Sequence, residues 1–251
     1  MSSIKSSKIR LSDLILKILI NIAAAFSVLL LVGILAYVFL KGIGSVNLTF
    51  LTTVTSTLKG TVGIAGNIVN TLYIIVITLL IATPLGVGSA IYLNEYAKPG
   101  KLVRAIEFTT ETLSGIPSII FGLFGMMFFG TGLGLGYSIL TGALTLTLMV
   151  LPLITRNTQE ALKTVPDSYR SGALGMGATK WYMIRTILLP SAMPGIVTGI
   201  ILAIGRIVGE SAALLFTAGS GYLLPKGGMG ILKKILESGG TLTIQLYLSM
   251  A

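Results

Sequence analysis

Long apolar runs are the feature that most constrains what this chain can fold into. Several approach the ~20 residues that an α-helix needs to cross the ~30 Å hydrocarbon core of a bilayer. The composition agrees, because 53% of the residues are hydrophobic, only 10% are charged and the mean hydropathy is +0.93. Backbone polar groups inside lipid must be paired within the chain, so these runs predict an all-α, polytopic membrane helix bundle. The expected spans cover about 14–40, 68–93, 114–130, 137–155 and 191–218.

The apolar runs differ in length and regularity. The first is too long for the apolar part of a cleavable signal peptide. The third is short and contains Pro117, Gly122 and Gly125, while Pro84 and Gly86 predict a kink in the second. No obvious repeat or low-complexity linker divides the chain, so we expect residues 1–251 to form a single transmembrane domain.

The distribution of Lys and Arg predicts the topology. If the N-terminus is cytoplasmic, twelve of the 18 basic residues lie inside and five outside, as the positive-inside rule requires, and Arg206 lies within a span. Loops facing anionic lipid then explain the net charge of +10, without nucleic-acid binding. The inner set is Lys5, Lys8, Arg10, Lys17, Lys98, Lys101, Arg104, Arg156, Lys163, Arg170, Lys180 and Arg185, and the outer set is Lys41, Lys59, Lys226, Lys233 and Lys234.

Several kinds of chemistry are missing from the sequence. There is no Cys and no His, so thiol and imidazole catalysis are excluded. Glu107 and Glu111 are one helical turn apart, but beside Arg104 they are expected to form a solvated face and not a metal or acid/base site. No G-x-x-x-x-G-K-[ST] phosphate loop is present, so we predict no ATP site of that kind on this chain. The sequence has no convincing nucleophile–base or metal-ligand set either, so we predict no catalytic residue and no metal site.

The polar loop 156–190 has the local signals of two short helices. Pro166 and Asp167 suit the start of a helix, and Gly175 or Gly177 can end it in the left-handed conformation. Thr179 is a suitable N-cap for a second helix, which Pro190 is expected to stop. The apolar positions of this second helix are Trp181, Ile184, Ile187 and Leu188.

This predicted helix–glycine turn–helix has two interpretations. It can lie in a groove of a soluble partner and carry the partner's motion into the bundle. It can equally be an ordinary amphipathic loop at the membrane surface, with Trp181 as an interfacial anchor.

The loop resembles the EAA loop of ABC importer permeases. That pattern is Glu-Ala-Ala, three residues, Gly, nine residues and then I-x-L-P, and here Gly177 precedes Ile187-Leu188-Leu189-Pro190 at the full spacing. The triplet itself departs, because Ser171-Gly172-Ala173 keeps only the last alanine. The resemblance implies contact with an ATPase subunit through Tyr169, Ser171, Gly172, Ala173, Gly177, Ala178, Thr179, Leu189 and Pro190.

Other stretches are similar to the PstA-type permeases of bacterial phosphate importers, namely 60–72, 114–124, 160–174 and 194–218. The resemblance implies the type I (MetI-like) importer fold in a bacterial or archaeal cytoplasmic membrane. It implies a second permease subunit, two ATPase subunits that bind ATP and Mg, and a periplasmic or lipid-anchored phosphate-binding protein. It also implies a sixth span after 219–247, so we expect this chain to be a fragment.

Arg206 and Glu210 are the candidate substrate residues. An isolated cation in a span costs about 2.5–3.5 kcal/mol, so Arg206 needs a partner or a water-filled path. Counted along a continuous helix, Glu210 lies one turn on, and Gly195, Gly199 and Ala203 continue the same face. The pair then either lines a phosphate path or is only an ion pair between permease subunits. The small residues either leave room for the ion or let another helix approach.

Ser114 and Ser118 flank Pro117 and either place hydroxyls near this path or cap a helix. Two rival functions stay open. One is a permease for another oxyanion, such as molybdate or sulfate. The other is an ion-coupled secondary transporter or channel, which would be expected to carry several intramembrane acidic residues or an inverted repeat.

Overall fold

The structure is a computed structural model that describes residues 11–56, 60–98, 100–224 and 230–250. The chain forms two compact units, 1–51 and 52–251, and each is described by itself. In the first unit, helix α1 (Leu11–Gly42) is followed by the short 3₁₀ turn η1 (Ile43–Ser45). The 32 residues of α1 extend about 48 Å, which is long enough to cross a membrane and confirms a helix over the expected span 14–40.

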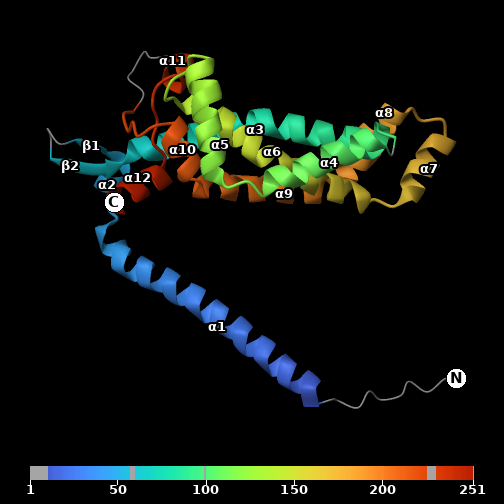
Figure 1. The fold of residues 1–251 in the computed structure, drawn as a ribbon, viewed down its shortest axis with the longest axis horizontal. Coiled ribbons are helices and arrows are strands. Elements are labelled where there is room, and N and C mark those ends of the chain that lie inside the picture. Colours follow the sequence, from blue (N-terminus) through green and yellow to red (C-terminus); the bar gives the residue numbers. More distant parts are fainter. Residues whose placement is uncertain (1–10, 57–59, 99, 225–229, 251) are drawn as a thin grey trace. The chain divides into compact units, whose positions relative to one another are not determined.

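The second unit is a helix bundle with a small hairpin at one end (Figure 1). Helix α2 (Leu48–Thr52) ends at the boundary between the units, and β1 (Val54–Ser56) pairs antiparallel with β2 (Thr61–Ile64). The elements that follow are α3 (Ala65–Ile91), the π turn η2 (Tyr92–Tyr96), α4 (Lys101–Ser114), α5 (Ser118–Gly125), the π turn η3 (Met126–Gly132), α6 (Ile139–Lys163), α7 (Asp167–Gly175), α8 (Lys180–Met183), the π turn η4 (Ile184–Leu188), α9 (Leu189–Gly209), α10 (Ala212–Thr217), α11 (Ile231–Ile235) and α12 (Leu242–Met250).

Helix α6 forms the centre of this bundle and packs against α3, α5, α9 and α10. Its first half, with Leu146 and Val150, belongs to one buried apolar cluster, and Leu162 near its end belongs to a second. Small residues let its neighbours approach closely: a Cβ added to Gly86 of α3 would lie 2.8 Å from Ile154 Cγ2. Helix α3 is continuous through Pro84 and Gly86, where the sequence predicts a kink.

Among the described residues, four helical runs are long and apolar enough to cross a membrane. They cover the expected spans 14–40 and 68–93, and the expected span 137–155 from Ile139 onward. Helix α6 continues eight residues past the predicted end at 155, so residues 156–163 are helix and not loop. The segment that connects α6 to the next helix therefore begins at Thr164.

The predicted span 114–130 belongs to a bent pair of helices. Helices α4 and α5, the latter extended by η3, meet at 102°, and they count as a fifth crossing only if the pair is taken as one span. The bend falls at Gly115–Pro117, where Pro117 disfavours a helical conformation of the residue before it. Helix α4 itself is amphipathic, and Glu107 and Glu111 lie exposed on it, as expected.

The predicted span 191–218 is wrong at its C-terminal end, which lies beyond the end of the helix. Its helical run begins at Lys180 and ends at Gly209, after which Glu210 has an extended backbone (φ −81°, ψ 123°). Residues 212–217 form the separate helix α10, whose Ala213 packs against Gly122 of α5. A Cβ on Gly122 would lie 2.8 Å from Ala213 Cα, so glycine is needed for this approach.

The segment after α10 folds back onto the start of α3, at the hairpin end of the bundle (Figure 1). The side-chain amide of Asn67 donates to the Gly240 carbonyl at 3.1 Å, and that of Asn70 donates to the Gly221 carbonyl at 2.9 Å. Lys234, expected in an outer loop, is buried and donates from Nζ to the Leu223 carbonyl at 2.8 Å. Each of these amide and ammonium donors thus has a carbonyl partner, which buried donors require.

Candidate functional site

The segment between α6 and α9 folds as the predicted helix–glycine turn–helix. Helix α7 ends in a Schellman motif, in which the Gly177 amide donates to the Leu174 carbonyl and the Ala178 amide to the Ala173 carbonyl, both at 3.0 Å. Gly177 has φ +82°, which confirms the left-handed stop expected at Gly175 or Gly177. The predicted N-cap is also confirmed, because Thr179 Oγ1 accepts from the Tyr182 amide at 3.3 Å.

Pro190 does not stop the second helix, contrary to our expectation. The chain stays helical from α8 through η4 into α9, and Pro190 lies in the first turn of α9. The π turn explains this result, because a widened turn accommodates a proline that lacks an N–H donor. The Ser191 hydroxyl donates to the Ile187 carbonyl at 2.7 Å and satisfies that acceptor. The second helix is thus the end of a spanning run and not a separate helix along the membrane surface.

One face of residues 164–183 is buried and the other is exposed. We call these residues the coupling segment, after the role that the resemblance to the EAA loop implies. Ala173, Met183 and Ile184 are buried in the same apolar cluster as Leu162. Ser171 and Gly172, which replace Glu-Ala of the family pattern, are exposed, whereas the retained Ala173 points into the cluster. The exposed apolar side chains are Tyr169, Leu174, Met176, Trp181 and Tyr182. Exposed apolar side chains gathered within 14 residues of one segment are typical of a surface that binds another protein.

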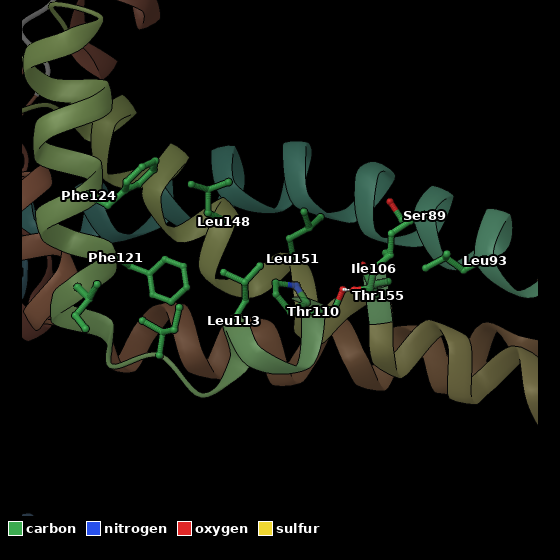
Figure 2. Close-up of a pocket in the computed structure, with 13 residues that line it drawn as sticks. Ser89, Leu93, Ile106, Thr110, Leu113, Phe121, Phe124, Leu148, Leu151 and Thr155 are labelled. Atoms are coloured by element: carbon green, nitrogen blue, oxygen red, sulfur yellow. Dashed lines mark hydrogen bonds between the residues drawn. The ribbon is translucent and has the colours of Figure 1, made fainter. Parts of the chain in front are cut away.

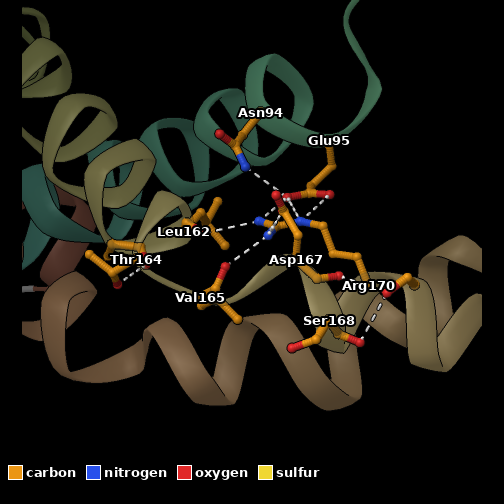
Figure 3. Close-up of polar contacts among 10 residues, drawn as sticks. Asn94, Glu95, Leu162, Thr164, Val165, Asp167, Ser168 and Arg170 are labelled. Carbon is orange, nitrogen blue, oxygen red and sulfur yellow. Dashed lines mark hydrogen bonds and ion pairs between the residues drawn. The ribbon is translucent and has the colours of Figure 1, made fainter.

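Arg170 ties this segment to two other elements (Figure 3). Its Nη2 donates to Glu95 Oε1 at 2.9 Å and to the Leu162 carbonyl at 3.0 Å, and its Nε donates to Glu95 Oε1 at 3.2 Å. Its Nη1 donates to the Val165 carbonyl and to Asp167 Oδ1, both at 2.9 Å. The hydrogen bond to Glu95 raises the pKa of Arg170 above its usual high value, although burial opposes the shift. The guanidinium therefore stays charged at physiological pH.

Sequence reasoning counted Arg170 only as one of the cytoplasmic positive charges. Its partner Glu95 lies in η2, 75 residues earlier, and no spacing rule connects the two. The local Asp167–Arg170 pair, three residues apart, was a weak signal that a helix turn formed there.

Arg206 and Glu210 do not form the pair that the sequence suggested. Because α9 ends at Gly209, Glu210 turns away and its Oε1 accepts from the Ala213 amide at 3.0 Å, so it caps the start of α10. Its carbonyl accepts from the Thr243 hydroxyl at 2.8 Å. Among the described residues, the half-buried Arg206 guanidinium has no hydrogen-bond or ion-pair partner.

Replacing Glu210 by alanine is therefore expected to destabilise α10. Glu210 precedes the N-cap residue Ser211 and accepts from the free Ala213 amide of the first turn. Loss of such a capping hydrogen bond costs about 1 kcal/mol of unfolding free energy, which a thermal-denaturation assay in detergent should detect as a lower Tm. Glu160→Ala, at an exposed carboxylate on α6, is the control and should change Tm little. An unchanged Tm for Glu210→Ala would contradict the capping role.

The small residues on α9 face α6. A Cβ added to Gly199 would lie 2.7 Å from Asn157 Cβ, and one added to Gly195 would lie 2.6 Å from Ala161 Cβ. Ala203 is fully buried in the central cluster. Of the two interpretations left open, close helix approach is the one that applies to Gly195 and Gly199.

Ser114 and Ser118 lie on either side of the α4–α5 bend. The Ser114 hydroxyl donates back to the Thr110 carbonyl at 3.0 Å, at the end of α4. Ser118 is the first residue of α5, whose N-cap position, Pro117, carries no side-chain cap. Neither serine caps the start of α5, and the hydrogen bond of Ser114 is local to the last turn of α4.

A cavity of about 470 Å³ lies between α3, α4, α5 and α6 (Figure 2). Leu113, Phe121 and Phe124 are among its mostly apolar lining, and the lining hydroxyls of Ser89 and Thr110 donate to carbonyls of their own helices. None of the candidate path residues lines it. An anion would find few free donors there, so this cavity is not the expected substrate path.

A bundle of apolar helices long enough to cross a membrane, with an exposed helix–glycine turn–helix between two of them, is the architecture of a membrane transport permease. The family profile of the binding-protein-dependent transport system inner membrane component matches residues 82–248, and the chain belongs to this family. It is therefore a multi-pass inner-membrane protein.

Particular relatives extend the comparison. The chain is 40% identical over 210 residues to the "Probable ABC transporter permease protein YqgI" of Bacillus subtilis (strain 168), covering 84% of this chain and 71% of that protein. It is 37% identical over 178 residues to the "Phosphate transport system permease protein PstA" of Xylella fastidiosa (strain 9a5c), covering 71% of this chain and 62% of that protein. The chain thus spans less than two thirds of that PstA.

A solved structure supports the fold. A chain of the MetNI methionine ABC transporter, captured in an inward facing conformation, superposes with a TM-score of 0.52 at 24% identity, covering 75% of this chain and 87% of that one. This likeness confirms the MetI-like permease fold predicted from the sequence.

Proposed function

We propose that this chain is the membrane-spanning permease subunit of an ATP-driven importer that moves inorganic phosphate into the cell. The observation that carries the proposal is the coupling segment: a capped helix–glycine turn–helix, exposed on one side and built into α6 and α9 on the other. The PstA name of a 37% identical relative supports phosphate as the cargo.

ATP hydrolysis takes place on two partner subunits, which bind ATP and Mg, and this chain binds neither. The exposed side chains of Tyr169, Met176 and Trp181 supply apolar docking surface in place of the acidic residue of the family pattern. A second permease subunit completes the membrane part, and a periplasmic or lipid-anchored binding protein delivers phosphate. The N-terminus is cytoplasmic, and the coupling segment lies on the same side.

Arg206 is the proposed phosphate contact in the membrane. Its planar guanidinium offers paired donors that match phosphate oxygens, and it has no competing partner among the described residues. Glu210 lies four residues further along the sequence but accepts a hydrogen bond from α10, so it shapes the end of the path and does not neutralise Arg206. Ser114 and Ser118 contribute hydroxyls at the α4–α5 bend, while Gly199 and Ala203 hold α9 against α6.

Uptake by proteoliposomes tests this function. They should contain the full-length form of this subunit with its partner permease, ATPase and binding protein. We expect ATP-dependent uptake of radiolabelled phosphate that excess sulfate or molybdate does not inhibit. Uptake of sulfate or molybdate in place of phosphate would refute the phosphate assignment and make the protein a permease for another oxyanion. Uptake driven by an ion gradient without ATP would instead indicate a secondary transporter.

A further inference from the structure

The coupling segment is joined by the chain itself to only two of the bundle helices. It follows α6 directly and continues through α8 and η4 into α9. Helix α3 packs beside both, but its end is far away in sequence, and movement of α7 reaches it only through side-chain contacts. Two such contacts meet at the π turn η2, which closes α3.

The first contact is the Arg170 guanidinium, which uses donors on all three nitrogens. Nε and Nη2 donate to Glu95 of η2, and Nη2 also donates to the Leu162 carbonyl of α6 (Figure 3). Nη1 donates to Asp167 of α7 and to the Val165 carbonyl just after α6. One planar group thereby joins α3, α6 and α7. A lysine ammonium has three donors on a single atom and cannot reproduce this fork.

The carboxylate of Glu95 is buried and accepts a hydrogen bond from Asn94 as well as from Arg170. Only 5% of its side chain is exposed, against 19% for Arg170, and Asn94 Nδ2 donates to its Oε1 at 2.7 Å. A buried carboxylate without its cation is strongly unfavourable, so the two residues must move together. The contact is therefore stiff, unlike an ion pair on an open surface.

The second contact holds the other half of the coupling segment. Lys180 Nζ, at the start of α8, lies 4.9 Å from the centroid of the Tyr96 ring, within the range of a cation–π interaction. Neighbouring residues of η2, Glu95 and Tyr96, thus hold α7 and α8 respectively.

We propose that η2 is the joint that couples α7 to α3, with Arg170 and Glu95 as its positioning residues. Through it, displacement of α7 by an ATPase subunit moves α3 together with α6 and α9. This inference rests on the proposed function, because it requires an ATPase partner at the coupling segment.

The test compares Arg170→Lys, Glu95→Gln and the double variant with the native subunit in the complete reconstituted complex. Three quantities are measured: anion uptake, ATP hydrolysis and the ATPase subunits retained on purification. We expect the uptake per ATP hydrolysed to fall about tenfold or more in each single variant, with the ATPase still bound. The double variant should be no worse than the worse single variant, since both changes break the same joint. Glu160→Gln is the matched control, because the Glu160 side chain is 60% exposed and forms a 3.2 Å ion pair with Lys163. For this variant the uptake per ATP hydrolysed should equal that of the native subunit.

Two results would refute the proposal that η2 couples α7 to α3. One is a native ratio of uptake to hydrolysis in both single variants. The other is loss of bound ATPase with a native ratio in the complexes that remain, which would make η2 a purely structural support. This test is independent of the identity of the transported anion. The ratio of uptake to ATP hydrolysis is measured with phosphate, sulfate or molybdate, whichever the native complex carries. If the native complex carries none of them, the readout is the stimulation of ATP hydrolysis by the permease.

Discussion

Arg206→Gln is expected to lower ATP-driven phosphate uptake by about ten- to a hundredfold. A charge-assisted hydrogen bond contributes about 1.5–3 kcal/mol, and glutamine is a shorter, polar side chain that keeps an N–H donor while removing the charge. The guanidinium has no partner among the described residues that its removal would leave unpaired. The loss should therefore appear in transport, and assembly with the ATPase should remain.

Initial uptake rates over a range of phosphate concentrations measure this effect. Arg104→Gln removes the same charge from the exposed face of α4 and is the control, with uptake expected close to native. Native uptake by Arg206→Gln would remove Arg206 from the path. It would leave Arg206 with the alternative role of an ion pair with the second permease subunit.

Gly199→Ala is expected to destabilise the bundle by about 1–3 kcal/mol, the usual cost of overpacking. The new methyl group would lie 2.7 Å from Asn157 Cβ, so α6 and α9 would have to separate. Gly205→Ala on the same helix meets no atom within 4 Å and is the matched control. There the better helix propensity of alanine should leave stability unchanged or raise it by up to about 1 kcal/mol.

Thermal denaturation of the two purified variants in detergent distinguishes these expectations. Gly199→Ala should lower Tm by several degrees, whereas Gly205→Ala should not lower it. Equal shifts would mean that α6 and α9 tolerate a side chain at position 199. The small residues would then be free to line a path, as the other interpretation of the sequence proposed.

Local signals in the sequence were sufficient to predict where the helices of the coupling segment end and begin. The stop at Gly177 and the cap at Thr179 depend on hydrogen bonds to residues within five positions, so their pattern is readable without the fold. Pro190 misled the prediction because a proline ends a regular α-helix, and the π turn that accommodates it leaves no clear mark in the sequence.

The predicted substrate pair shows the opposite case. Placing Arg206 and Glu210 on one face assumed that the helix continued beyond Gly209. The glycine and the following Glu-Ser have the character of a helix end and a new cap, but the apolar residues of 212–217 concealed the break. Glu210 caps α10 because α10 turns aside to pack on α5, a contact that no local pattern contains.

The sequence by itself determined the membrane class, the helical character of the chain, the position of the coupling segment and the family. These follow from hydropathy, chain-local hydrogen bonds and motif spacing, which depend on neighbouring residues. The tertiary structure alone decided that Arg170 meets Glu95, that Gly199 serves the approach of α6 and that Glu210 leaves Arg206 unpaired within the described chain. Those contacts join residues of separate elements, and only the packing of the helices brings such residues together.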